Sequence, residues 1–130
     1  MYVLDTNTLI YFFKGMGEVK RHLFSHAPGE IYIPSIVIYE LQTGIAKSTH
    51  PHKRRRQLTL LLEQVSVISF GEREAEAAAG IRTDLEARGL PIGPIDTLIA
   101  GTALAHSRTL VTHNTREFGR VKGLRVEDWY

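Results

Sequence analysis

The chain has 130 residues, and its 16 Lys and Arg against 14 Asp and Glu give a formal net charge of +2 at neutral pH. This length predicts a single domain over residues 1–130, which buries about two-thirds of its unfolded surface without a disulfide or metal staple. The absence of cysteine excludes disulfide frameworks and thiolate zinc sites, and no apolar run reaches the ~18 residues of a membrane helix. We therefore expect an unexported, cytoplasmic protein that does not contact a membrane.

The first predicted element is a short buried strand at residues 2–4, because its apolar residues run directly into Asp5, Thr6 and Asn7. The apolar residues 9–13 that follow predict a helix beginning at these polar side chains. In an open parallel sheet, ligands bind outside the carboxyl ends of the strands, which is where Asp5 lies. Asp5 is also a good helix N-cap, so these residues alone leave both roles open.

Residues 18–26 are compatible with a short helix that ends at the breaker segment 27–29. A second buried strand is predicted at residues 31–33, and Pro34 then opens a helix. Glu40 lies within this helix among mostly apolar neighbours. A lone helical glutamate is ordinarily solvated, but an unpaired carboxylate among apolar side chains is unfavourable unless it binds a cation.

The one dense basic run leads into a helix with an apolar face, and it consists of Lys53, Arg54, Arg55 and Arg56. Guanidinium groups pair well with phosphate oxygens, so the run could contact a nucleic-acid backbone. The alternative is the solvated entrance and outer face of an amphipathic helix. The neighbouring His50 and His52 lack a third ligand and predict no zinc site.

A third strand is predicted at residues 65–70, followed by an alanine-rich helix at 72–88 that Gly89 ends. One approximate face of this helix consists of Ala75, Ala78, Ala79, Arg82 and Leu85. Pro94 suits the first turn of a further helix, which places Asp96 in that turn. There Asp96 could stabilise the helix through its dipole or belong to a shared site.

A fourth strand is predicted at residues 109–112, and it ends in a second polar cluster at residues 113–118. A short fifth strand is predicted at residues 123–126. Strands that alternate with helices indicate βαβ units and a parallel sheet covered on both faces. We therefore expect an α/β fold, a three-layer α/β/α domain with a mainly parallel sheet of about five strands.

Polar residues recur at strand ends and in helices along one edge of the expected sheet: Asp5, Glu40, Asp96 and Asn114. The edge of a parallel sheet can bring such side chains within metal-binding distance. Hard oxygen ligands without cysteine favour Mg²⁺ or Mn²⁺, and such a site can hydrolyse phosphodiesters. If three acids converge on a metal ion, the rest of the surface is clearly basic, which suits an anionic partner.

Taken in this order, the chain resembles the PIN-domain ribonucleases and, within them, the VapC-type toxins of bacterial toxin-antitoxin pairs. The resemblance covers essentially the whole chain, and its motifs are Leu4-Asp5-Thr6-Asn7, Pro34-Ser35, Tyr39-Glu40-Leu41, Ile95-Asp96-Thr97-Leu98-Ile99-Ala100 and Thr112-His113-Asn114-Thr115-Arg116-Glu117-Phe118. Each motif is weak alone, but their order and separation are specific. The closing stretch at residues 126–129 is similar to the branch of initiator-tRNA-specific endonucleases.

The resemblance implies that Asp5, Glu40 and Asp96 are the catalytic carboxylates and bind Mg²⁺ or Mn²⁺. It implies that Thr6 and Asn7 orient Asp5 and bound water. The supporting residues around the metal ligands are then Thr6, Asn7, Thr112, Asn114 and Glu117.

Many relatives carry a fourth acid where this chain has Asn114. An amide supplies one neutral oxygen, so the number of bound ions, one or two, stays open. Glu117 could provide the missing charge or form a surface ion pair with Arg116. A further alternative is that Asn114 only caps the short helix that begins near Thr115.

The implied activity is a metal-dependent endoribonuclease that inhibits translation by cleaving RNA, with tRNA and its anticodon-loop region as the expected target. Arg116 and the basic run at 53–56 would hold the RNA backbone. The implied partners are a cognate VapB-type antitoxin that blocks the site and a second toxin copy, giving a homodimer and a toxin-antitoxin hetero-oligomer.

Two other classes of function remain as alternatives. A haloacid-dehalogenase-like phosphohydrolase also begins with a strand and an Asp, but it requires a second Asp where this chain has Asn7. A non-cleaving RNA-binding module would use the basic run without metal chemistry.

Overall fold

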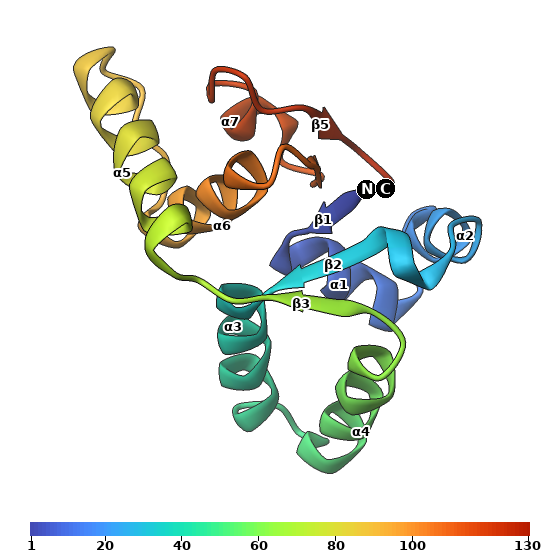
Figure 1. The fold of residues 1–130 in the computed structure, drawn as a ribbon. Helices are drawn as coiled ribbons and strands as arrows, with labels where there is room; N and C mark the ends of the chain where they lie inside the picture. The colour runs from blue at the N-terminus through green and yellow to red at the C-terminus, as the bar shows by residue number, and fades with distance from the viewer.

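A five-stranded sheet forms the centre of the computed structural model, which describes residues 1–130, and its strand order is β3-β2-β1-β4-β5 (Figure 1). All neighbouring strands run parallel. The strands are β1 (Tyr2–Leu4), β2 (Ile31–Pro34), β3 (Ser66–Ile68), β4 (Thr109–Val111) and β5 (Val126–Glu127). The predicted α/β class and parallel sheet are therefore confirmed.

The helices cover both faces of this sheet. They are α1 (Thr6–Lys14), α2 (Val19–Phe24), α3 (Ser35–Ala46), α4 (Pro51–Leu62), α5 (Glu72–Ala87), α6 (Pro94–Ala105) and α7 (Thr115–Phe118), with a single 3₁₀ turn at Pro28–Glu30. In Figure 1, α1, α3 and α4 lie on one side of the sheet, and α5 and α6 lie on the other. None of these helices is both long enough and apolar enough to cross a membrane.

The order of the strands places β1 in the middle, where both of its faces are covered. Val3 and Leu4 of β1, and Leu110 and Val111 of β4, are completely buried. Such continuous apolar runs are typical of parallel strands that have helices on both sides. The residue that follows β1 therefore stands at the centre of the sheet's carboxyl edge.

Several predicted boundaries differ from the structure. The fifth strand covers Val126–Glu127 instead of residues 123–126, because Gly123 forms a turn with a φ of 81°. Strand β3 is shorter than the predicted 65–70. The basic run lies within a helix and does not precede one, because α4 begins at Pro51.

Helices α5 and α6 form a closely packed hairpin. The buried residues of α5 are Glu74, Ala78, Ile81 and Leu85, whereas Ala75, Ala79 and Arg82 of the predicted face are exposed. The contact depends on Gly101 in α6, where an added Cβ would lie 2.7 Å from the Cβ of Ala78. The apolar pattern of α5 alone does not reveal this, because its buried stripe includes a glutamate.

Glu74 of α5 contacts the residue that follows α6 and so links the two helices at one end of the hairpin. Its carboxylate accepts a hydrogen bond from the backbone N of Gly71 at 2.8 Å and lies 2.8 Å from Nε2 of His106, just after α6. The Gly71 hydrogen bond, together with His106, lowers the pKa of Glu74, although burial opposes the shift. Glu74 is therefore satisfied as an ionised group despite its burial.

The close approach at Gly101 can be tested by adding one methyl group. Gly101→Ala is expected to lower the free energy of unfolding by about 1–3 kcal/mol, because the new Cβ would overlap the backbone and Cβ of Ala78. Gly80→Ala in α5 is the matched control, since its added Cβ meets nothing within 4 Å. That control is expected to raise stability by about 0.5–1 kcal/mol through helix propensity. Equal effects in urea unfolding would contradict this packing.

Candidate active site

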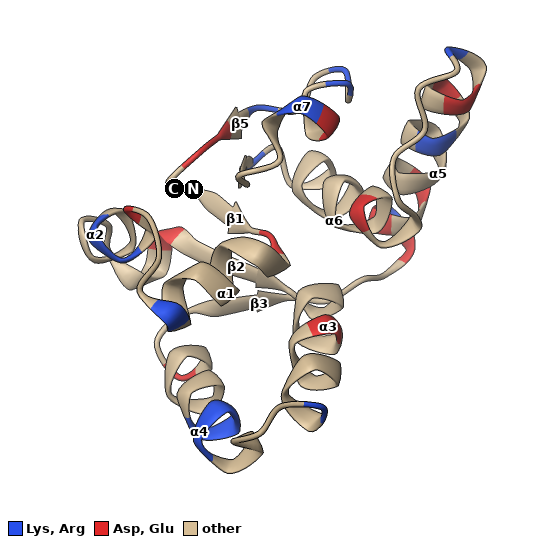
Figure 2. Ribbon diagram, turned by 180° about the vertical axis from the view of Figure 1, so that it is seen from behind, with Lys and Arg blue, Asp and Glu red and all other residues tan.

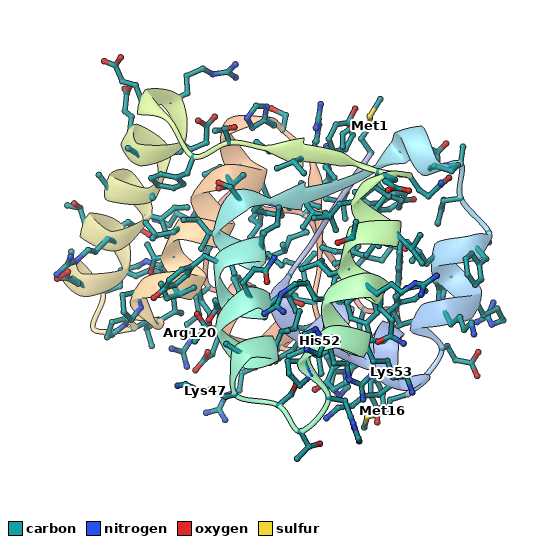
Figure 3. All side chains as sticks on the ribbon, turned by 90° about the horizontal axis from the view of Figure 1, so that it is seen from below. Met1, Met16, Lys47, His52, Lys53 and Arg120 are labelled. Atoms are coloured by element: carbon teal, nitrogen blue, oxygen red, sulfur yellow. The ribbon has the colours of Figure 1, made fainter.

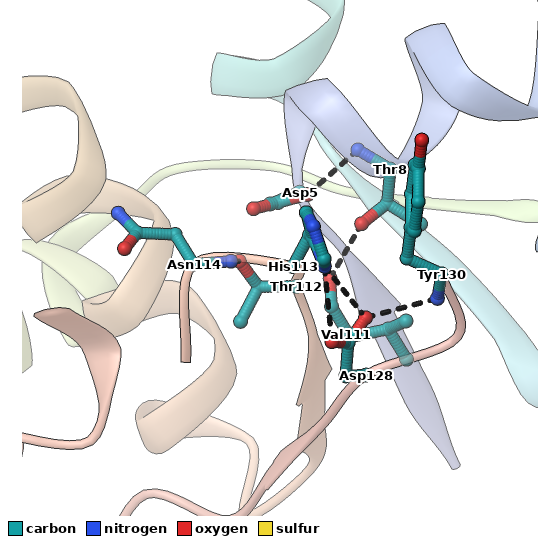
Figure 4. Close-up of polar contacts among 8 residues, drawn as sticks. All are labelled: Asp5, Thr8, Val111, Thr112, His113, Asn114, Asp128 and Tyr130. Atoms are coloured by element: carbon teal, nitrogen blue, oxygen red, sulfur yellow. Dashed lines mark hydrogen bonds and ion pairs between the residues drawn. The ribbon is translucent and has the colours of Figure 1, made fainter. Parts of the chain in front are cut away.

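Asp5 follows β1 directly and has two roles at once. Its carboxylate accepts a hydrogen bond from the backbone N of Thr8 at 2.9 Å, so it caps α1 (Figure 4). Its backbone N donates to the carbonyl of Val111 at 3.2 Å, which fixes it beside the end of β4. Asp5 is therefore both the helix cap and a carboxylate at the central edge of the sheet, and these two interpretations are compatible.

The surroundings of Asp5 favour its protonated form. Burial raises the pKa of Asp5, and the charge of Glu40 adds to this, while hydrogen bonds from Thr112 and Thr8 act in the opposite direction. Thr8 also donates from its hydroxyl to the carbonyl of Val111 at 3.2 Å. Sequence reasoning missed Thr8, because its side-chain contact is to Val111, 103 residues away in the chain.

Asp96 lies in the first turn of α6 and is half-buried. Burial raises its pKa to about 6, and the negative charges of Asp5, Glu40 and Glu117 raise it in the same direction. A helix N-terminus would lower the pKa of an acid, so burial and like charge outweigh the dipole here. The carboxylates predicted from distant parts of the chain thus act on one another electrostatically.

Glu40 projects from α3, where it is partly exposed, and accepts a hydrogen bond from the hydroxyl of Thr6. Thr6 therefore orients Glu40, while the backbone of Thr8 holds Asp5. Asn7 is exposed and its side chain makes no hydrogen bond within the chain. Figure 2 shows acidic segments at the end of β1, in α3 and at the start of α6 around the same edge of the sheet.

Asn114 occupies the N-cap position of α7, yet its side chain makes no capping hydrogen bond. Its Nδ2 instead donates to Oε2 of Glu117 at 2.7 Å, and its backbone N donates to the hydroxyl of Thr112 at 3.0 Å. The side-chain capping role is thus not seen. Glu117 is directed by Asn114, and no ion pair joins Glu117 to Arg116, which is exposed.

The basic run occupies the first turns of α4, which packs alongside α3 (Figure 3). Lys53, Arg55 and Arg56 are exposed, whereas Arg54 is half-buried and hydrogen-bonds to Oε1 of Gln57 at 3.2 Å. Arg54 and Glu40 line the same groove, which has a volume of about 290 Å³. One end of the run therefore shares a surface with an acidic site residue.

The donor chemistry of this edge fits a divalent cation. Its four interacting carboxylates, Asp5, Glu40, Asp96 and Glu117, form no ion pair with Lys, Arg or His. Carboxylate oxygens are the ligands that Mg²⁺ and Mn²⁺ prefer. No three acidic or histidine side chains are grouped closely enough to hold one ion between them. Asp5 is hydrogen-bonded by the backbone of Thr8, and Glu40 by the hydroxyl of Thr6.

The chain is also similar to proteins of known family. Residues 2–124 match the model of the PIN domain. The chain belongs to the PIN-domain family. It is 36% identical over 128 residues to a Shigella flexneri protein named tRNA(fMet)-specific endonuclease VapC, covering 98% of this chain and 97% of that relative. A Rickettsia felis protein named Ribonuclease VapC2 is 35% identical over 137 residues, covering 99% and 98% of the two chains.

Solved structures give the same result for this PIN domain. A crystal structure of VapBC2 from Rickettsia felis bound to a DNA fragment from its promoter superposes with a TM-score of 0.92 at 37% identity, covering 99% of this chain and 98% of that chain. DNA-bound VapBC from Salmonella typhimurium also gives 0.92, at 35% identity and the same coverage. The resemblance to PIN-domain VapC proteins is confirmed along the whole chain.

The electrostatic repulsion at Asp96 can be measured through its effect on the stability of the folded protein. An acid whose pKa rises on folding binds its proton more tightly in the folded state, so the folded state loses stability as pH rises from about 4 to about 6. Asp96→Asn removes that charge and is expected to raise the thermal midpoint at pH 8 without added metal. At pH 4, where Asp96 is already largely protonated in the folded state, the gain should be much smaller.

Asp84→Asn is the matched control on α5. The hydrogen bond from Arg88 lowers the pKa of Asp84, so its loss should leave stability unchanged or reduce it at pH 8. A destabilised Asp96→Asn protein at pH 8 would contradict the electrostatic description of the site.

Proposed function

We propose that this PIN domain is a divalent-metal-dependent endoribonuclease that cleaves tRNA in its anticodon-loop region and thereby inhibits translation. The observation that carries the proposal is the half-buried Asp96 carboxylate, which lies in the field of Asp5, Glu40 and Glu117 without a compensating cation. The Shigella flexneri relative is named a tRNA(fMet)-specific endonuclease, which supports tRNA as the substrate. The target in the cytoplasm is then an abundant, structured RNA with unpaired loops.

In this proposal Asp5, Glu40 and Asp96, whose side chains would have to come closer together, would hold the Mg²⁺ or Mn²⁺, and Glu117 would supply the fourth negative charge. The bound cation supplies charge neutralisation at the phosphate and acidification of water. Asp96 must be ionised to bind it, and with a pKa of about 6 it is mostly ionised at neutral pH. Binding is therefore expected to weaken as the pH falls below that value.

The neutral groups of the edge keep these carboxylates in place. Thr6 donates to Glu40, and the backbone of Thr8 donates to Asp5. Asn114 donates a hydrogen bond to Glu117, so its amide orients the Glu117 carboxylate. This role is separate from a direct contact between Asn114 and an ion. Substitution of Asn114 by Asp would remove this donor and place a like charge beside Glu117.

The partners proposed for this chain are a VapB-type antitoxin and a second copy of itself. The similar crystal structures from Rickettsia felis and Salmonella typhimurium are VapBC assemblies, which supports the antitoxin. The homodimer and the toxin-antitoxin hetero-oligomer follow from the family resemblance. A haloacid-dehalogenase-like activity is set aside because the chain matches the PIN domain, whereas a non-cleaving RNA-binding module is separated by experiment.

Cleavage of purified tRNA tests the proposal directly. The natural protein is expected to yield discrete fragments with Mg²⁺ or Mn²⁺ and none after a chelator is added. Asp5→Asn and Asp96→Asn should each abolish cleavage while retaining the circular dichroism spectrum, because each removes a ligand charge. Glu63→Gln, an exposed acid after α4, is the control and should cleave normally. Retention of tRNA without fragments would favour a binding module, and chelator-resistant cleavage would exclude the metal site.

The role of the basic run is tested separately through salt dependence. Single changes of Arg54, Arg55 and Arg56 to Gln are each expected to reduce the slope of log affinity against log salt by about one. Arg82→Gln is the control, because Arg82 lies on α5 and pairs with Glu86 at 2.7 Å. Unchanged slopes in all three variants would assign the run to a solvated helix face.

A further inference from the structure

Three aromatic rings pack against one another after β4, at the C-terminus and in α1, and we call His113, Tyr130 and Tyr11 the aromatic ledge. The rings of His113 and Tyr130 are stacked with centroids 4.2 Å apart and an interplanar angle of 22°. Tyr11 of α1 meets Tyr130 edge-on at 4.9 Å and His113 at 5.9 Å. These distances are within the range of favourable aromatic pairs.

Hydrogen bonds to Asp128 hold the aromatic ledge in place. Nδ1 of His113 donates to Asp128 at 3.0 Å, and the same carboxylate accepts from the backbone N of Tyr130 at 2.9 Å (Figure 4). The carbonyl of Tyr130 accepts from Glu18 at 2.8 Å. Trp129, between these residues, is buried and stacks against both His22 and His26. A ring held in this way keeps its orientation when a ligand arrives.

The position of the aromatic ledge connects it to the acidic edge. Leu4 pairs in register with Val111, so His113 lies two residues beyond the strand pair that places Asp5. Its two chain neighbours already belong to the edge, since Thr112 lowers the pKa of Asp5 and Asn114 hydrogen-bonds to Glu117. A strand of RNA whose phosphate lies at the carboxylates would therefore pass next to His113.

The aromatic ledge is partly exposed to solvent. The His113 side chain is 45% exposed and Tyr130 is 42% exposed, although the two rings are stacked and the His113 ring is hydrogen-bonded to Asp128. The neighbouring Trp129, by contrast, belongs to the hydrophobic core. The exposed surface of the aromatic ledge is thus available to a ligand.

The charge around the aromatic ledge decides which part of RNA it suits. Asp128 is bonded to His113, and the carboxylates of the edge are nearby, so a phosphate would be repelled there unless a cation were bound. A nucleobase is uncharged and has a flat face that stacks on aromatic rings. Unpaired bases can reach such rings, whereas paired bases cannot.

We propose that the aromatic ledge stacks an unpaired nucleobase next to the cleaved bond, with His113 and Tyr130 as the base-binding residues. This rests on the proposed ribonuclease function and deepens it. Stacking tolerates any base, so the aromatic ledge selects unpaired RNA rather than one sequence. It differs from the basic run in that its contribution does not depend on salt.

The test uses the full chain carrying Asp96→Asn, which prevents cleavage, and a single-stranded RNA oligonucleotide containing the fluorescent adenine analogue 2-aminopurine. Binding is expected to quench the analogue through stacking. His113→Ala and Tyr130→Ala should each weaken binding about tenfold and remove the quenching without changing the salt slope. His113→Phe keeps a flat ring and should retain both affinity and quenching. Phe24→Ala on α2, which removes a more exposed aromatic ring, is the control and should bind normally.

The outcomes separate this inference from the proposed function. If the natural protein cleaves tRNA but the two Ala variants bind RNA with unchanged affinity, the base-stacking role of the aromatic ledge is wrong, whereas the ribonuclease function is supported. If His113→Phe binds as weakly as His113→Ala, a polar contact replaces stacking and the inference is overturned. If the natural protein neither binds nor cleaves RNA, the ribonuclease function fails first and the aromatic ledge fails with it.

Discussion

The ionised form of Asp96 is disfavoured by its burial and by the negative charges of Asp5, Glu40 and Glu117. The fold nevertheless holds these like charges at one edge of the sheet. The acids come from four separate elements, because a parallel sheet collects the ends of its strands and the starts of its helices at one edge. No basic side chain neutralises them. The edge is therefore an anionic site built into the fold.

Neutral donors do most of the positioning within this site. Hydroxyl and amide groups hold three of the four carboxylates in a defined direction without neutralising them: Thr6 for Glu40, the backbone of Thr8 for Asp5, and Asn114 for Glu117. A lysine or arginine in the same places would form an ion pair and compete with a metal ion. The polar, uncharged residues of the two strand-end motifs are thus as informative as the acids.

Much of this arrangement can be predicted from the sequence, and the remainder depends on tertiary contacts. Asp5 and Asp96 can be located because a strand end and a helix start have local signals, and the order of the family motifs adds Glu40. The bond from Asn114 to Glu117 cannot be predicted, because it depends on the side-chain rotamers. Burial of Glu74 is equally hidden, since its partner His106 is 32 residues away and a glutamate interrupts the apolar pattern.

The α5–α6 hairpin has a mechanical consequence for the site. Helix α5 packs extensively only on α6, and α6 is also the helix that carries Asp96. Local opening of this hairpin would release one side of α6 from its support while leaving the strands paired. The free energy that closes the hairpin is thus part of the free energy that keeps the anionic edge assembled. Substitutions on the far side of α5 would then act on cleavage by changing the population of closed molecules, without touching a residue that meets the substrate.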